Sequence, residues 1–380
     1  MDTRRELTEL AVALIEAESV NPALGAGGSG ERAAAEVVAA WARHRGLDVE
    51  VDEVLPGRPN VVVTFSGAAA GPTLMLNGHL DTVGAGGMER PFEGRIAEAR
   101  LYGRGAYDMK GAIAAALVAA ARARGEGLPG AVVVACVIDE ELGSKGTERL
   151  LEVCRADAAI VCEPTDERIR IAHKGFAGFQ IEMPGRAAHG SRPDLGVDAI
   201  AAMGTVLTRL EELSDRLGRE QGHPLLGPGS VHASLIEGGQ EYSSYPARCL
   251  VTGERRSIPG ESSAEISREL EALVAGTPAR FRLTFGRDPF EIGADHPFAG
   301  EVAAAAGADG FEGIAFWTDA ALLAGAGIPT VVYGPAGEGA HADEEWVDLA
   351  SLERCCDAYL AVARRLTAPV DLADVLPSPL

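Results

Sequence analysis

Four apolar, strand-like segments of this chain each run directly into histidine or carboxylate residues. The residues that follow the four segments are, in order, His79 and Asp81; Asp139, Glu140 and Glu141; Glu163; and, after a glycine-rich stretch, His341. Helical patterns separate the segments, so the sheet they form is mainly parallel. Open sheets of this kind place ligand sites at the carboxyl ends of their strands. The sequence therefore predicts an α/β domain with one polar site at an edge of its sheet.

The pattern of strands and helices changes twice along the chain, which predicts a discontinuous domain. Residues 1–175 begin with the helical spacing of Leu7, Leu10, Ala11, Leu14 and Ile15 and continue with helices and apolar strands. Residues 176–289 show polar strands and single helices in the order β-α-β-β-α-β, which is typical of a ferredoxin-like domain. The first pattern returns in residues 290–380. We expect an α/β domain of residues 1–175 and 290–380, interrupted by an inserted α+β domain.

Charge and hydropathy exclude several classes of function. The chain has 34 Lys and Arg residues against 56 Asp and Glu residues, a net charge of −22, which repels phosphate backbones and anionic lipids. The longest apolar run, Ala112–Ala121, is far shorter than the roughly 20 residues of a membrane-spanning helix. Acidic residues interrupt the apolar positions near the N-terminus, unlike a signal peptide, and the six cysteines form no CxxC pair. We expect a cytoplasmic protein with reduced thiols that binds neither nucleic acid nor membranes.

A fifth segment, Gly103–Gly111, brings Asp108 to the start of an alanine-rich helix. Taken alone, Asp108 could be a helix cap and His341 a surface histidine. Five separate segments with metal-ligand residue types favour a metal site over these alternatives. Histidines and carboxylates without thiolates suit Zn²⁺, with Co²⁺ or Mn²⁺ as substitutes, and two such ions could share one bridging carboxylate.

Adjacent Glu140 and Glu141 are expected to have different roles, because the side chains of neighbouring residues diverge. One would bind metal and the other would take a proton from water. Asp81, two residues after His79, could orient the imidazole ring.

The motifs resemble those of one superfamily of metallohydrolases. They are His79-x-Asp81, Gly103-Arg104-Gly105-x-x-Asp108-Met109-Lys110, Asp139-Glu140-Glu141-x-Gly143, Cys162-Glu163-Pro164-Thr165 and the late His341. This order resembles the superfamily of acetylornithine deacetylase, succinyl-diaminopimelate desuccinylase, aminoacylase and glutamate carboxypeptidase. The resemblance implies a dizinc catalytic domain interrupted by a ferredoxin-like lid and dimerisation domain.

The same resemblance implies a role for each residue of the site. One zinc would be held by His79 and Glu163 and the other by Glu141 and His341, while Asp108 bridges them. Glu140 would be the general base. The peptide bond between Asp108 and Met109 would be cis.

In the inserted domain, the resemblance points to residues that contact the substrate. His189, in the segment Gly185–Pro193, resembles a histidine that reaches the partner subunit's site and stabilises an oxyanion, so a homodimer is implied. Arg256 resembles an arginine that binds the substrate's carboxylate. Two positions depart from the family pattern: Ser243 or Ser244 stands where relatives have Asn, and Trp317 stands where they have a small residue.

The expected activity is metal-dependent hydrolysis of the amide bond of a small N-acyl amino acid. Three alternatives stay open: a dipeptidase or carboxypeptidase with the same dizinc site, hydrolysis of a carbamoyl group or an ester, and a non-catalytic metal-binding relative. The two departures from the family pattern prevent the assignment of a named substrate.

Overall fold

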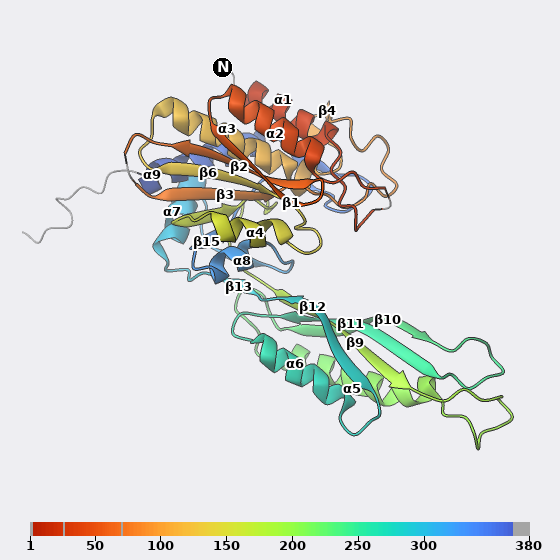
Figure 1. Cartoon of the computed structure of the whole chain (residues 1–380). Coiled ribbons are helices and arrows are strands. Elements are labelled where there is room, and N and C mark those ends of the chain that lie inside the picture. The colour runs from red at the N-terminus through yellow and green to blue at the C-terminus, as the bar shows by residue number, and fades with distance from the viewer. Residues whose placement is uncertain (1–2, 26, 70, 368–380) are drawn as a thin grey trace, which may run out of the picture. The chain divides into compact units, whose positions relative to one another are not determined.

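The computed structural model describes residues 3–25, 27–69 and 71–367, and they form two compact units. Unit 1 contains residues up to Ile171 together with Ile292–Glu312 and the described residues from Thr318 onward. Unit 2 contains Ala172–Glu291 and Gly313–Trp317. Figure 1 traces the chain from red to blue through both units. The short segment 313–317 falls in unit 2, although its sequence lies within the expected catalytic segment 290–380, whose residues 368–380 lie outside the described part.

The large sheet of unit 1 has a parallel centre and an antiparallel edge. Six of its nine strands follow the order β1-β2-β6-β3-β7-β15, and β8, β13 and β14 complete it. Strand β3 pairs in parallel with β6 and β7, and β7 with β15, whereas β1 with β2 and β2 with β6 are antiparallel. The strands are β1 (Asp48–Leu55), β2 (Arg58–Ser66), β3 (Thr73–His79), β6 (Ala131–Val137), β7 (Ala158–Val161) and β15 (Thr330–Val332). The predicted mainly parallel arrangement is thus confirmed for the strands that carry the site.

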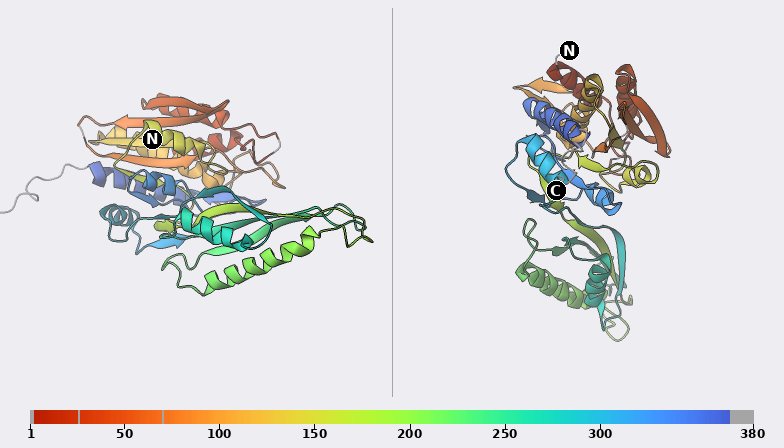
Figure 2. Two further views of the ribbon diagram at one scale, coloured as in Figure 1. Left: turned by 60° about the horizontal axis from the view of Figure 1, so that its bottom comes forward. Right: turned by 90° about the vertical axis from the view of Figure 1, so that its left-hand side faces the viewer.

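Helices cover both faces of this sheet. Successive side chains of a strand point to opposite faces, and every residue of β7 and all but the first of β3 and β6 are buried. Helix α3 packs against β2, β3 and β6, while α4 packs on the opposite side, as Figures 1 and 2 show. The helices of unit 1 are α1 (Thr3–Glu16), α2 (Arg32–His44), α3 (Gly111–Glu126), α4 (Lys145–Val153), α7 (Pro297–Ala306), α8 (Ala320–Gly325) and α9 (Leu349–Thr367).

The helices follow the apolar pattern of the sequence. The predicted apolar face of the first helix is confirmed, because Leu7, Leu10, Ala11, Leu14 and Ile15 are its buried residues. Helix α3 is buried on nearly all sides, since it contacts the sheet, α1 and α9, and small alanine side chains allow this close packing.

A small sheet in unit 1 joins segments that are far apart in the sequence. Its order is β16-β17-β5-β4, with strands β4 (Arg95–Ala97), β5 (Arg100–Tyr102), β16 (Gly337–Glu338) and β17 (Trp346–Asp348). The antiparallel pairing of β17 with β5 sets Trp346 opposite Tyr102. This pairing brings the segment after β5, which contains Asp108, next to the segment between β16 and β17, which contains His341.

Unit 2 has the predicted ferredoxin-like order. Its sheet follows β10-β11-β9-β12, with antiparallel neighbours throughout. Helices α5 and α6 lie on one face of the sheet (Figure 2), where residues such as Phe179, Leu210 and Leu270 form its core. The elements are β9 (Gly175–Pro184), α5 (Ala199–Arg219), β10 (Ser230–Gly238), β11 (Arg248–Ser257), α6 (Ser263–Glu271), the short helix η2 (Ala272–Val274) and β12 (Arg280–Arg287).

Three short strands, β8 (Arg170–His173), β13 (Phe290–Glu291) and β14 (Glu312–Ile314), lie where the chain passes between units. None of the helices in the described ranges is long and apolar enough to cross a membrane. All six cysteines are unpaired, and all but Cys154 are buried.

Candidate metal centre

The parallel strands of unit 1 deliver the predicted polar residues to one edge of the sheet. His79 is the last residue of β3, Glu140 and Glu141 follow β6, and Glu163 follows β7. Because β6, β3, β7 and β15 are parallel neighbours, these carboxyl ends lie together. Two groups of potential ligand atoms result, one from His79, Asp108 and Glu141 and one from His79, Glu140 and Glu163, and within each group the ligand atoms lie within 4.8 Å of one another.

The ring of His79 is fixed by the main chain. Its Nδ1 lies 2.9 Å from the backbone carbonyl oxygen of Asp81, and a carbonyl can only accept a hydrogen bond. The neutral ring therefore carries its proton on Nδ1 and presents the lone pair of Nε2 to the site. Nε2 lies 3.0 Å from Asp108 Oδ1 and 3.6 Å from Glu163 Oε1. Burial alone would lower the pKa of His79, but the charges of Glu163 and Asp108 raise it well above its usual value.

Asp108 lies between two histidines. Its Oδ1 faces His79, and its Oδ2 lies 3.4 Å from Nε2 of His341. Burial would raise the pKa of Asp108, but hydrogen bonds from both histidines lower it. The residue lies in η1 (Ala106–Lys110), and the predicted cis peptide bond between Asp108 and Met109 is confirmed. One oxygen of this carboxylate therefore faces His79 and the other faces His341.

His341 completes the second side of the site from a loop. Its Nε2 lies 3.0 Å from Glu141 Oε2. Hydrogen bonds to Asp108 and Glu141 raise the pKa of His341 to about 10. The side chain is 55% exposed, and the residue has a φ of 63°, a left-handed conformation that is rare outside glycine. Loop geometry, rather than a strand end, therefore presents this histidine.

Glu140 and Glu163 share one part of the site, where Glu163 is buried and Glu140 is partly buried. Burial and the neighbouring charge of Glu163 raise the pKa of the Glu140 carboxyl well above its usual value. Burial also raises the pKa of Glu163.

The main chain passes close behind Glu163, because a Cβ at Gly334 would lie only 2.2 Å from the Glu163 carbonyl oxygen. Glycine is therefore needed at that position after β15.

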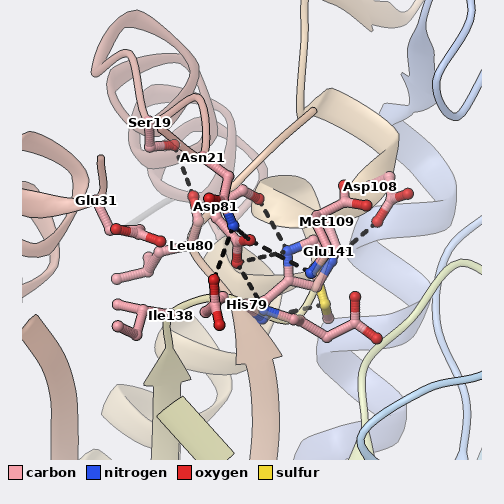
Figure 3. Close-up of polar contacts among 12 residues, drawn as sticks. Ser19, Asn21, Glu31, His79, Leu80, Asp81, Asp108, Met109, Ile138 and Glu141 are labelled. Atoms are coloured by element: carbon pink, nitrogen blue, oxygen red, sulfur yellow. Dashed lines mark hydrogen bonds and ion pairs between the residues drawn. The ribbon is translucent and has the colours of Figure 1, made fainter. Parts of the chain in front are cut away.

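The carboxylate of Asp81 holds the segment that carries Glu140 and Glu141. Its Oδ1 accepts a hydrogen bond from the Glu140 backbone N–H at 3.1 Å, and its Oδ2 accepts one from the Glu141 N–H at 3.3 Å. Asn21 donates to the same carboxylate at 2.9 Å and to Asp139 at 3.1 Å. Figure 3 shows Asn21 and Asp81 beside His79. Burial raises the pKa of Asp81 to about 7.

A buried ion-pair group continues this network. Arg58 donates two hydrogen bonds to Glu31, at 2.6 and 2.8 Å, and a third to Asp139 at 3.2 Å. Asp139 has a φ of 67°. The start of the Glu140 segment is therefore held from two sides, by Asn21 and by Arg58.

In unit 2, His189 and Ser243 are neighbours. The N–H of Gly190 donates to the Ser243 carbonyl at 2.7 Å. The backbone N–H of Ser191 donates to His189 Nδ1 at 3.2 Å, so the neutral ring carries its proton on Nε2 and presents a donor to solvent. The Ser243 hydroxyl donates to Glu241 at 2.6 Å. The ring of His189 is thus held in the tautomer that a hydrogen-bond donor needs.

Arg256 and Trp317 share a different part of unit 2, around Phe176. The Arg256 guanidinium lies 5.4 Å from the centre of the Phe176 ring, and its Nε donates to Glu254 at 2.5 Å. Trp317 packs edge-on against Phe176 and donates from Nε1 to the Asp288 carbonyl at 3.1 Å. The indole is therefore fixed in an aromatic cluster.

Arg255, which precedes Arg256, and His173 are both buried. Arg255 is paired with Glu261 and Glu269. His173 makes a ring contact with Phe290.

Comparison with known proteins identifies the family. The model of peptidase family M20/M25/M40 matches residues 75–365. The chain belongs to this family. An acetylornithine deacetylase of Myxococcus xanthus is 33% identical over 334 residues, which cover 82% of this chain and 85% of the relative. The chain is therefore a metallohydrolase, and the predicted superfamily is confirmed.

Solved structures confirm the fold within the M20 family. The aminopeptidase PepT of Bacillus cereus superposes with a TM-score of 0.77 at 18% identity, covering 96% of this chain and 98% of that one. The YXEP protein of Bacillus subtilis, a dinuclear metal-binding peptidase of the M20 family, gives a TM-score of 0.70 at 17% identity, covering 97% and 99%.

The donor set suits a pair of cations, as the M20 family implies. Carboxylates of Asp108, Glu140, Glu141 and Glu163 converge with the two histidines. Among the described residues, Glu141 Oε1 is a buried oxygen without a hydrogen-bond partner, which a bound cation would satisfy. The raised pKa of His341 reflects the same surplus of negative charge. These residues can therefore hold a dimetal centre.

Two further residues beside this M20 site were not identified from the sequence. Glu345 accepts hydrogen bonds from the main chain around Asp108, and Arg104 pairs with Glu345. Arg104 lies in the Gly103–Gly111 motif, and Glu345 lies four residues after His341. This proximity to predicted ligands is the only signal in the sequence.

Proposed function

We propose that the protein hydrolyses the amide bond of a small N-acyl amino acid. The observation that carries this proposal is the position of Asp108, whose two oxygens face His79 and His341 while Glu140 lies beside His79 and Glu163. The acetylornithine deacetylase relative supports a deacylase. The likeness to the PepT aminopeptidase and to the YXEP peptidase supports a peptidase as the second candidate. That candidate is the dipeptidase or carboxypeptidase with the same site.

The proposed site has two sides, each with its own ligands. His79 and Glu163 would hold the first ion, and Glu141 and His341 would hold the second. Asp108 would contribute to both. Nitrogen and oxygen donors without thiolates support Zn²⁺, with Co²⁺ or Mn²⁺ as substitutes. When bound, such ions act as Lewis acids toward an amide carbonyl and lower the pKa of water.

Glu140 is the proposed general base, because it lies in one group of potential ligands with His79 and Glu163 and burial raises the pKa of its carboxyl. Its carboxylate takes a proton from water as the water oxygen bonds to the amide carbon. It then gives that proton to the nitrogen as the C–N bond breaks, so the products are a carboxylic acid and an amine, which ionise to a carboxylate and an ammonium group. In this proposal Asp81 acts by holding the Glu140 segment and, through its carbonyl, the ring of His79.

Unit 2 is the proposed lid and dimerisation domain, and it would supply the substrate contacts. His189, a donor at Nε2, would stabilise the oxyanion in the partner subunit's site. The terminal nitrogens of Arg256 would bind the substrate's carboxylate, because Nε is already paired with Glu254. Ser243 and Trp317 would shape the pocket, the latter as a fixed indole.

A homodimer is proposed, because His189 would act in the site of a partner subunit. Strand β10 lies at the edge of the unit 2 sheet, and its Leu235 and Ile236 are 62% and 55% exposed. An edge strand with exposed apolar side chains favours pairing with another chain.

The six unpaired cysteines support a reducing compartment such as the cytoplasm.

Substitution of the general base tests the reaction. With Zn²⁺ or Co²⁺ supplied, wild-type protein should release amine from at least one member of a panel of N-acetyl and N-succinyl amino acids and dipeptides. Glu140→Gln should lower kcat about 10²- to 10⁴-fold while the metal content stays the same. Glu152→Gln, on the exposed face of α4, is the matched control. Full activity of Glu140→Gln would refute the mechanism, and hydrolysis of dipeptides alone would favour the peptidase.

Subunit mixing tests the role of His189. Glu140→Gln and His189→Ala should each be nearly inactive. Heterodimers of the two contain one intact site, so unfolding and refolding an equal mixture should restore about a quarter of wild-type activity. Absence of recovery in a mixture that forms stable heterodimers would contradict action across the subunits.

A further inference from the structure

Glu345 is a buried carboxylate that binds the main chain on the N-terminal side of Asp108. The residue is 1% exposed. Its Oε1 accepts hydrogen bonds from the backbone N–H groups of Tyr107 at 2.8 Å and Asp108 at 3.0 Å. Its Oε2 accepts from the Gly105 N–H at 3.0 Å and from Arg104 Nη1 at 2.7 Å. Four donors thus satisfy both oxygens, and three of them belong to the main chain that presents Asp108.

Arg104 extends this contact to the segment that carries His341. The guanidinium is 2% exposed. While Nη1 binds Glu345, Nη2 donates to the carbonyl oxygen of Ala342 at 2.9 Å and Nε donates to that of Gly84 at 3.2 Å. Ala342 directly follows His341. One arginine therefore contacts both the residue that holds Asp108 and the neighbour of His341.

The two sides of the metal site differ in what supports them. His79 and Glu163 come directly from the buried strands β3 and β7, which neighbouring strands hold in register. His341 comes from a loop between the two-residue strand β16 and the three-residue strand β17, and it is mostly exposed. Sheet pairing therefore supports the first side, whereas side-chain contacts, including that of Arg104 with Ala342, hold the loop of His341.

We propose that Arg104 and Glu345 are positioning residues for the second metal ion, the one held by Glu141, His341 and Asp108. They set the spacing between the Asp108 carboxylate and the His341 ring, whose facing atoms are 3.4 Å apart. This inference rests on the proposed dimetal function. Arg104 and Glu345 lie outside the ligand set. Their substitution should therefore weaken binding of the second ion more than binding of the first.

Stepwise cobalt binding tests the proposal. Metal-free protein is titrated with Co²⁺, and binding is followed by visible absorption and by calorimetry. Wild-type protein should bind two ions. Glu345→Gln should bind the first with nearly unchanged affinity and the second about 10- to 100-fold more weakly. The absorption of the second cobalt should also change, because its ligands are displaced.

Two further variants make the test specific. Arg104→Lys keeps a positive charge but cannot contact Glu345 and Ala342 together, so it should also weaken the second ion. It serves as the test if Glu345→Gln does not fold. Glu269→Gln removes a carboxylate partner from the buried Arg255 in unit 2, and it should bind both ions as wild type does even if its melting temperature falls.

Unchanged affinities in Glu345→Gln, or an equal loss for both ions, would overturn the assignment and leave a purely structural ion pair. Failure of the wild-type protein to bind two cobalt ions would instead contradict the proposed function itself.

Discussion

The two histidines of the metal centre have the same chemistry but different surroundings. His79 is 1% exposed, ends a strand that is buried in all but its first residue, and donates from Nδ1 to a carbonyl oxygen. His341 is 55% exposed and lies in a loop in the left-handed region. Either ring presents Nε2 to an oxygen of Asp108. The difference shows that one metal centre can be built partly by sheet pairing and partly by a loop held by side-chain contacts.

The difference predicts unequal effects when each histidine is removed, and these are the largest effects we expect. His79→Ala should eliminate binding of the first ion and also lower stability, because it leaves a buried cavity beside Glu163 and Asp108. His341→Ala should eliminate binding of the second ion with little loss of stability, since its side chain is largely solvated. Metal content after dialysis and the melting temperature of the metal-free proteins measure the two effects separately.

Equal losses of stability in the two metal-free variants would show that the two histidines contribute alike to the fold. His296→Ala is a suitable control, because this partly buried histidine of unit 1 caps α7 by accepting from the Phe298 N–H. It should lower stability by about 1 kcal/mol, as loss of a helix cap does, without changing metal content.

Strand ends explain why much of the site could be predicted from the sequence. His79, Glu140, Glu141 and Glu163 each follow an apolar run, and parallel pairing brings such ends together whatever the detail of the loops. The position of Asp108 depends on a glycine-rich turn, and its bridging role came from the family resemblance. The order of elements in unit 2 was likewise visible in the alternation of strands and helices.

Other features left no clear pattern in the sequence. Strands β5 and β17 have three residues each, too few for an alternating pattern, so the small sheet that joins the two ligand segments was missed. Glu345 follows another acidic residue, and only the fold buries one of the two. Arg255 and Arg256 are also adjacent, yet Arg255 is the buried one because alternate residues of β11 face the core. Such assignments depend on which face of a short element is covered.

Substitution of Asp81 should have an intermediate effect, because this residue supports both His79 and the Glu140 segment. Its carbonyl oxygen holds His79, whereas its carboxylate holds the N–H groups of Glu140 and Glu141. Asp81→Asn keeps the carbonyl but sets an amide N–H₂ against a backbone donor. We therefore expect kcat to fall about 10- to 100-fold while the first ion binds almost normally. A loss confined to the first ion, measured by cobalt titration, would show that the carboxylate acts on His79 instead.

Asn21 should give the smallest effect, because its partners keep other donors. Its amide contacts Asp81 and Asp139, but Asp81 also binds backbone N–H groups and Asp139 also binds Arg58. Asn21→Ala should therefore lower the free energy of unfolding by about 1 kcal/mol and kcat by only a few-fold. Urea unfolding and steady-state kinetics measure the two quantities.

Asn60→Ala is the matched control for this last prediction. Asn60 is equally buried and makes two hydrogen bonds to the main chain, at Gly146 and Ile138, without contacting a carboxylate of the network. It should lose at least as much stability as Asn21→Ala while kcat stays unchanged. If both variants lost activity in proportion to stability, the Asn21 contacts would be ordinary core hydrogen bonds. A fall in kcat for Asn21→Ala alone would tie the network around Asp81 to the orientation of Glu140, and so to the buried side of the centre rather than to the loop of His341.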